Sequence, residues 1–430
     1  MNYFSLNKKA PNVSFQEAVV NGLAPDRGLY FPESITPLSK EIIDNISDYS
    51  NEEIAFEAVK QFVGDEIPAE ALKKIIAETI SFDFPVVGVT ENIGTLELFH
   101  GPTMAFKDVG ACFMARCLGY FNRSEATNVT VLVATSGDTG GAVANGFLGV
   151  KGVDVVILYP KGKVSEVQEK QLTTLGENIT ALEVNGVFDD CQDMVKTAFL
   201  DEGINRKLTS ANSINVARWL PQMLYYFFAY KQLHKKHKDI VFSVPSGNFG
   251  NICAGIVAQK LGLPVKHFVA ATNVNDTVPQ YLHTGKYDPK PSIATISNAM
   301  DVSNPSNFIR IQQLFENSID SLKTKFSSYS FTDEETRNTM KAIYSETKYI
   351  ADPHGAVGYL GLQKYNLEEG EYGVFLETAH PVKFLPVVEE TLNIKVDMPK
   401  QIKAIMDKEK IAINISSYEE LKSFLNKKSI

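Results

Sequence analysis

The segment HGPTMAFKDVGACF places one lysine, Lys107, where an amine can act as a nucleophile. Pro102 interrupts the chain, and apolar residues then recur at helical spacing, which predicts a helix from about Ala105. Lys107 lies in its first turn, where the helix dipole is positive and disfavours an ammonium group. Partial burial would lower its pKa further. Such a lysine suits a Schiff base. The alternative is a surface lysine paired with Asp108.

Three further segments are rich in glycine, serine, threonine and asparagine. SGNFGN, at 246–251, indicates a nest of backbone N–H groups for a phosphate, or else a tight turn. TSGDTGG, at 135–141, could hold a carboxylate or form a plain strand–helix turn. NSINVAR, at 212–218, could supply a second anion site. The alternative there is helix capping by Asn or Ser, with Arg218 on a solvated face.

Apolar, β-branched runs of strand length alternate with helical stretches along most of the chain, which predicts an α/β fold with parallel sheets. In such sheets ligands bind beyond the carboxyl ends of the strands. We therefore expect the loops TSGDTGG, PKGK, SGNFGN, TNVND and ETAHP to meet at one site. The predicted strands are 129–135, 153–159, 179–184, 240–244, 265–271 and 372–378.

The 430 residues divide into three predicted regions. Residues 1–88 form a mainly helical lobe, with helices near 53–62 and 69–80 and a turn into an extended stretch at 24–33. Residues 89–397 form the catalytic α/β region, with two lobes and the active site between them. Residues 398–430 are Lys-rich, and their pattern predicts a helical cap.

Composition restricts the classes of function. Hydrophobic residues make up 44% and charged residues 22%, which is typical of a soluble globular protein. The net charge of −9 and the lack of a basic block argue against nucleic-acid binding, and no apolar run is long enough to span a membrane. The four cysteines and seven histidines show no metal-ligand spacing, so we expect no metal. The N-terminus lacks a signal peptide, so we expect a cytoplasmic protein.

The order of the motifs resembles the threonine synthases, which belong to the fold-type II pyridoxal-phosphate enzymes. HGPTMAFKD, TSGDTGG, NSINVAR, SGNFGN and ETAHPVKF follow one another as in that family, and APDRGLYFP resembles its N-terminal signature. The likeness extends from about residue 24 to 384. It implies two parallel-sheet lobes plus the helical N-terminal lobe. One departure is that Arg27–Gly28 stands where the family usually has two glycines.

The resemblance also implies roles for individual residues. Lys107 would hold pyridoxal 5'-phosphate as a Schiff base and act as the base. The cofactor phosphate would lie on Gly247, Asn248, Phe249, Gly250 and Asn251, and Thr378 would face the pyridine nitrogen. Ser136, Gly137, Asp138 and Thr139 would hold the substrate carboxylate. The substrate phosphate would lie on Lys163, Asn212, Ser213, Asn215 and Arg218, and Asn273 would line the site.

The implied activity is a carbon–oxygen lyase reaction that converts O-phospho-L-homoserine and water to L-threonine and phosphate. The protein would be a monomer or a homodimer. One alternative is a phospholyase that releases 2-ketobutyrate. A serine or threonine dehydratase is a further alternative, but it would need no second anion site. A non-catalytic protein that binds the cofactor is also an alternative, although it would not require Lys107.

Overall fold

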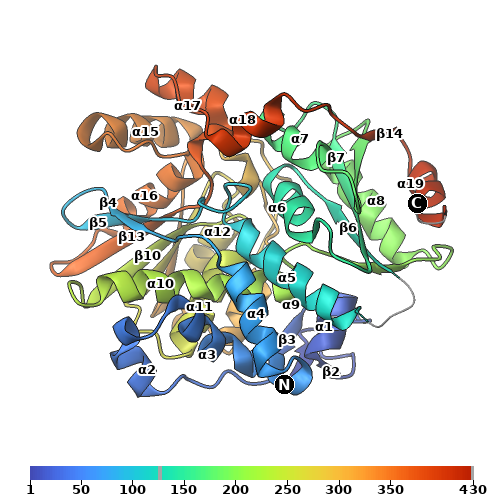
Figure 1. Ribbon diagram of the computed structural model, residues 1–430. Helices are drawn as coiled ribbons and strands as arrows, with labels where there is room; N and C mark the ends of the chain where they lie inside the picture. Colours follow the sequence, from blue (N-terminus) through green and yellow to red (C-terminus); the bar gives the residue numbers. More distant parts are fainter. Residues whose placement is uncertain (124–127, 428–430) are drawn as a thin grey trace.

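The computed structural model describes residues 1–123 and 128–427, and their strands form three sheets (Figure 1). The smallest is antiparallel, has the order β2-β1-β3 and lies in the N-terminal region. The two larger sheets contain the expected parallel strands. The small sheet consists of β1 (Asn2–Ser5), β2 (Val13–Ser14) and β3 (Tyr30–Pro32).

The six-stranded sheet has the order β12-β11-β10-β13-β5-β4, and only the edge strand β4 runs antiparallel to its neighbour. Strand β10 lies near the middle of this sheet and is buried along almost its whole length, because helices cover both faces, as expected of a parallel sheet. The strands are β4 (Val86–Gly88), β5 (Ile93–Glu97), β10 (Asp239–Pro245), β11 (His267–Thr272), β12 (Phe326–Ser330) and β13 (Glu371–Glu377).

The five-stranded sheet has the order β14-β8-β7-β6-β9 and is parallel throughout. Its strands are β6 (Val129–Ala134), β7 (Val153–Pro160), β8 (Ile179–Val184), β9 (Lys207–Thr209) and β14 (Ile413–Ile415). The helices that follow β6, β7 and β8 are α6 (Asp138–Phe147), α7 (Glu166–Thr173) and α8 (Phe188–Leu200), and α5 (Lys107–Phe121) packs against α6.

All six predicted strands are confirmed, but the two large sheets contain five others that were missed because they are short or lack a continuous apolar run. One of these changes the interpretation of the C-terminus, which was expected to be a helical cap. It contains α18 (Lys400–Met406) and α19 (Tyr418–Asn426), but β14 between them pairs with β8 and extends the sheet. Residues 428–430 of that predicted cap lie outside the described residues.

The N-terminal region combines its small sheet with α1 (Phe15–Asn21), α2 (Lys40–Asp44), α3 (Asn51–Val63) and α4 (Ala69–Thr79). Arg27 has φ 64°, a left-handed backbone that favours glycine. This explains why a glycine fits the position that Arg27 occupies here. At Gly28, an added Cβ would lie 2.0 Å from the Ser5 Oγ, so that residue must lack a side chain.

The apolar segment that begins at Trp219 forms a broken helix. Helix α9 (Val216–Trp219) passes into a 3-10 turn (Leu220–Met223) and then into α10 (Leu224–Leu233). The break contains Pro221, which lacks an N–H donor and crowds the preceding turn. The remaining helices are α11 (Gly250–Lys260), α12 (Thr277–Thr284), α13 (Phe308–Leu314), α14 (Ile319–Lys323), α15 (Asp333–Thr347), α16 (Pro353–Tyr365) and α17 (Leu385–Leu392).

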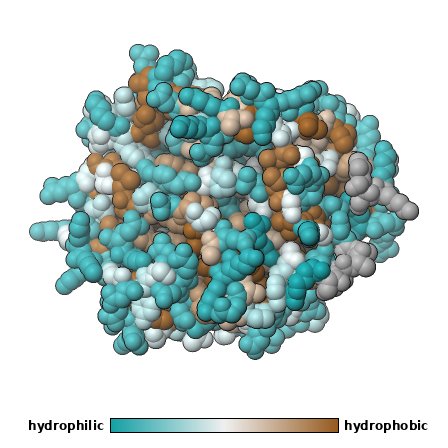
Figure 2. All heavy atoms as spheres, in the orientation of Figure 1, coloured by the Kyte–Doolittle hydropathy of each residue, from teal (hydrophilic) through white to brown (hydrophobic). Residues whose placement is uncertain are grey.

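Figure 2 shows a largely hydrophilic face on which the hydrophobic patches are small and separate. Within residues 1–123 and 128–427, no helix is both long enough and apolar enough to cross a lipid bilayer.

Candidate active site

The predicted motif loops follow the carboxyl ends of strands in both large sheets, and α5 begins at Lys107 beside them. The Phe106 N–H donates to the Thr378 carbonyl at 2.8 Å, which ties the start of α5 to the end of β13. The predicted lysine and the predicted pyridine-facing threonine are therefore brought together by backbone pairing. An isolated bridge between Ala105 and Ala379 strengthens the same junction.

Buried side chains fix the backbone of Lys107. Arg218 Nη1 donates to the Lys107 carbonyl at 3.0 Å, and the Tyr225 hydroxyl donates to the Phe106 carbonyl. At Gly110 the helix meets Arg218 so closely that an added Cβ would lie 2.2 Å from its carbonyl oxygen. Arg218 is thus buried rather than solvated, and it acts on the backbone of the lysine turn.

The Lys107 amine has a pKa lowered to about 8. Loss of hydration is the main cause, and the positive charges of Lys383 and Arg218 lower it further, while Asp138 opposes them. With this pKa, roughly a tenth of the amine is neutral at pH 7 and about half at pH 8. Neutral amine is the form that attacks a carbonyl or removes a proton.

The SGNFGN loop joins β10 to α11, and its geometry suits a phosphate. Phe249 is left-handed with φ 59°, and the N–H groups in the first turn of α11 have no helical partners. Asn251 Oδ1 accepts from the Tyr226 hydroxyl at 2.6 Å, whereas its buried Nδ2 has no partner among the described residues. Gly247 must lack a side chain, since a Cβ would lie 2.8 Å from the Met300 Cα. The orphaned amide and the free N–H groups fit a phosphate anion.

The loop at 136–139 is organised by two side chains outside it. Thr135 Oγ1 accepts from the Gly137 N–H at 3.0 Å and the Gly140 N–H at 2.9 Å, which shapes the turn into α6. Gly137 has φ 146°, and an added Cβ would lie 2.4 Å from Gln168 Nε2. Ser136 and Thr139 are partly exposed, while Asp138 is buried.

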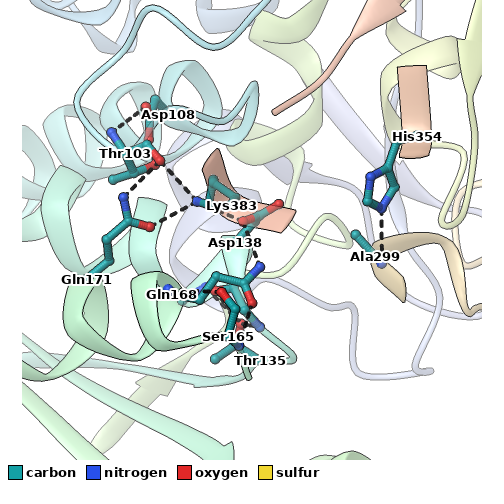
Figure 3. Close-up of polar contacts among 12 residues, drawn as sticks. Thr103, Asp108, Thr135, Asp138, Ser165, Gln168, Gln171, Ala299, His354 and Lys383 are labelled. Carbon is teal, nitrogen blue, oxygen red and sulfur yellow. Dashed lines mark hydrogen bonds and ion pairs between the residues drawn. The ribbon is translucent and has the colours of Figure 1, made fainter. Parts of the chain in front are cut away.

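Asp138 is paired with a residue to which the sequence interpretation gave no role. Lys383 Nζ lies 2.7 Å from Asp138 Oδ1, and its side chain is fully buried. It also donates to the Thr103 carbonyl at 3.0 Å and to Gln171 Oε1 at 2.9 Å (Figure 3). We call these residues, with Gln168, the Lys383 cluster. The ETAHPVKF motif contains Lys383, but its spacing does not reveal a partner so far away in sequence.

The NSINVAR segment contributes mainly structural contacts. Asn215 caps α9, and its amide donates to the Val19 carbonyl at 2.8 Å, so its side chain is occupied. Ser213 Oγ accepts from Asn307 Nδ2 at 3.1 Å, and the buried Arg310 donates to the carbonyls of residues 213 and 214. Asn212 is partly exposed.

Of two other predicted site residues, Lys163 is exposed and Asn273 is buried. Lys163 is exposed, and no contact joins it to Arg218 in the part of the chain that the structure describes, so the structure does not gather the two cations. Asn273 is buried after β11, and its amide bonds Thr295, Asp301 and Asn275. It therefore shapes the loop, and its place in the substrate site stays a prediction.

A second buried group of charged residues lies at the start of α16 and was also missed. His354 Nδ1 lies 2.8 Å from Asp352 Oδ1, and the Ala299 N–H donates to His354 Nε2 at 3.3 Å (Figure 3). Glu377 is fully buried, and its carboxyl group faces the carboxyl group and the backbone N–H of Asp352. Burial raises its pKa well above the usual value, and the Asp352 charge raises it further. We call Asp352, His354 and Glu377 the Glu377 cluster.

Three family profiles match the chain. "Threonine synthase N terminus" covers residues 2–80, "Pyridoxal-phosphate dependent enzyme" covers 95–378, and "Threonine synthase, C-terminal" covers 355–425. The threonine synthase of Escherichia coli (strain K12) is 46% identical over 405 residues, 94% of each chain.

Solved structures agree with these matches. The crystal structure of threonine synthase from Escherichia coli has a TM-score of 0.92 at 44% identity and covers 99% of each chain. A threonine synthase from Brucella melitensis, solved with pyridoxal phosphate bound, has a TM-score of 0.93 at 34% identity over 99% of each chain. The matches span the whole chain, from the N-terminal region to β14. The chain belongs to the threonine synthase family of pyridoxal-phosphate-dependent enzymes.

Proposed function

We propose that the protein converts O-phospho-L-homoserine and water to L-threonine and phosphate, the last step of threonine biosynthesis, in the cytoplasm. The observation that carries the proposal is the position of Lys107. Its amine has a lowered pKa and lies at the turn that pairs with Thr378, in a chain whose whole length matches threonine synthases. The active unit would be a monomer or a homodimer.

Lys107 would hold the cofactor, and Gly247, Asn248, Phe249, Gly250 and Asn251 would bind its phosphate. The orphaned Asn251 amide and the first-turn N–H groups of α11 support this assignment. Thr378 would place a neutral hydroxyl toward the ring nitrogen. When bound, pyridoxal phosphate supplies a conjugated ring that accepts the electrons left at Cα after a proton is removed.

Lys107 would remove the Cα proton, because its lowered pKa leaves it largely unprotonated at slightly alkaline pH. The hydroxyl and N–H groups at 136–139 would hold the substrate carboxylate and orient Cα toward this amine. Loss of a Cβ proton and of phosphate from Cγ would follow, and water would add at Cβ. Holding the departing phosphate requires donors or cations.

We assign the substrate phosphate to the side of the site formed by Lys163, Asn212, Ser213, Asn215 and Arg218, and Asn273 would line the site. Within this group, Asn212 and Ser213 are partly exposed, and Lys163 is free to reorient because it is exposed. Arg218 and Asn215 support the site through the backbone that they bond. Their replacement should therefore disturb Lys107 as well as phosphate binding.

The product formed from O-phospho-L-homoserine tests the reaction. We expect the purified holoenzyme to release L-threonine and inorganic phosphate in equal amounts, measured by chromatography and a phosphate assay. Release of 2-ketobutyrate without threonine would identify a phospholyase instead.

The attachment point is tested separately by borohydride reduction and peptide mapping. We expect the label on Lys107 alone, and Lys107→Ala should lower kcat by at least about a thousandfold because both the attachment and the base are lost. A label on another lysine would contradict the assignment. The exposed Lys395, paired only with Glu389, provides the matched control.

A further inference from the structure

Lys383 is held as a fully bonded ammonium group. Its three N–H donors meet three acceptors: Asp138 Oδ1 at 2.7 Å, Gln171 Oε1 at 2.9 Å and the Thr103 carbonyl at 3.0 Å. Its side chain has no solvent exposure. A lysine bonded in this way has no donor left for a ligand. Lys383 can therefore affect the reaction only through the groups that it bonds.

Asp138 presents a problem for the proposed carboxylate site. It is the first residue of α6, in the loop that would receive the substrate carboxylate, and it is buried. Its carboxyl stays ionised because Lys383 and Lys107 hold its pKa well below the usual value, against the effect of burial. A buried negative charge beside an incoming carboxylate repels it strongly, because little water screens the two charges.

We propose that Lys383 is a positioning residue that determines carboxylate binding: by neutralising Asp138, it allows the loop at 136–139 to accept the substrate α-carboxylate. Lys383 also joins this loop to Thr103, which in turn bonds Asp108 beside the cofactor lysine. The carboxylate loop of one sheet is thereby aligned with Lys107 at the edge of the other. The inference rests on the proposed function, since it assumes an amino-acid substrate.

A double-mutant cycle tests the neutralisation. In the holoenzyme, L-threonine binding is followed by the visible absorbance of the cofactor. Lys383→Met should weaken L-threonine binding on the order of a hundredfold, since it exposes the ligand carboxylate to an uncompensated charge. In an Asp138→Asn background the same change should cost less than about threefold, because no charge remains to be neutralised. Equal losses in the two backgrounds would overturn the proposal.

The pH dependence separates electrostatics from a general structural defect. Without Lys383, burial should let Asp138 take up a proton at higher pH, although the Lys107 amine still faces it, as does the Asp108 carboxyl. The ratio of mutant to wild-type dissociation constants should therefore fall as the pH is lowered from about 9 to 6. A purely structural role predicts a ratio that does not change with pH. Lys383→Gln, which keeps a neutral donor, should show the same defect and serves if the Met variant does not fold.

Steady-state kinetics give a further readout and separate the two proposals. With O-phospho-L-homoserine, Lys383→Met should raise KM far more than it lowers kcat, while Lys395→Met should change neither. If the wild-type enzyme forms no threonine, the proposed function fails, yet the L-threonine titration still tests the pair. If threonine is formed and the cycle shows no coupling, only the role of Lys383 fails.

Discussion

The Lys383 cluster and the Glu377 cluster are both buried near Lys107, but the charges within them are arranged in opposite ways. In the first, Lys383 and Asp138 have opposite charges and every ammonium donor is bonded. In the second, Glu377 faces the like charge of Asp352, and no cation pairs with it among the described residues. The Lys383–Asp138 pair is therefore ionised, whereas Glu377 keeps its proton to a higher pH than an ordinary glutamate does. Burial alone does not decide the charge of a group, because its partners do.

Asp138→Asn should have the largest effect on stability. The substitution leaves the Lys383 ammonium buried without a counter-charge, and breaking such a pair costs about 3–5 kcal/mol. Chemical unfolding followed by circular dichroism measures the loss, and Lys383→Met in the same chain should restore much of it. Asp193→Asn, in an exposed pair with Lys196, is the matched control and should change little. A loss below about 1 kcal/mol in Asp138→Asn would mean that Lys383 is not held as an ion.

Sequence patterns predicted the strands and loops that carry the two clusters, but not which charged side chains meet in them. The apolar runs predicted six strands, and the motif loops follow their ends as expected, since strand length and alternation with helices are local properties. The partners of Asp138 and Glu377 come from segments far apart in the chain, and no local pattern specifies which side chains meet. The sequence allows Asn215 to cap a helix or to bind an anion, and only the fold shows that its amide is occupied.

Short strands and substituted turns also show where prediction from local sequence fails. Strand β14 has three residues and becomes a strand because β8 offers an open edge. Arg27 keeps a left-handed backbone that a glycine would adopt more readily, because the neighbouring contacts fix the turn. In both cases tertiary structure overrides a weak local preference.

Gly355→Ala tests how tightly the Glu377 cluster is packed. Gly355 lies against Glu377, and an added Cβ would be 2.0 Å from Oε1 and 2.2 Å from Cδ. Because the carboxyl is buried and cannot move into solvent, we expect a loss of about 1–3 kcal/mol. Gly358→Ala in the same helix is the control, since its Cβ would meet neighbours only at 3.4 Å. If the two variants are equally stable, Glu377 is not confined by α16.

Glu377→Gln should have the smallest effect on stability. Its effect should change with pH, whereas the effect of breaking an ionised pair should not. Unfolded glutamate loses its proton near about pH 4.3, whereas Glu377 keeps it to higher pH because burial, Asp352 and Glu97 raise its pKa. The wild type therefore loses stability as the pH rises above that value, and the amide variant does not. Relative to the wild type, the free energy of unfolding of Glu377→Gln should differ by less than about 1 kcal/mol near pH 4.5 and should rise toward pH 8.

The loss of stability in Asp138→Asn should stay constant over pH 5 to 8, since the lowered pKa of Asp138 and its unfolded value both lie below that range. Parallel unfolding curves for both variants across this range measure the contrast. If the stability of Glu377→Gln relative to the wild type does not change with pH, Glu377 is ionised and the two clusters are not opposites.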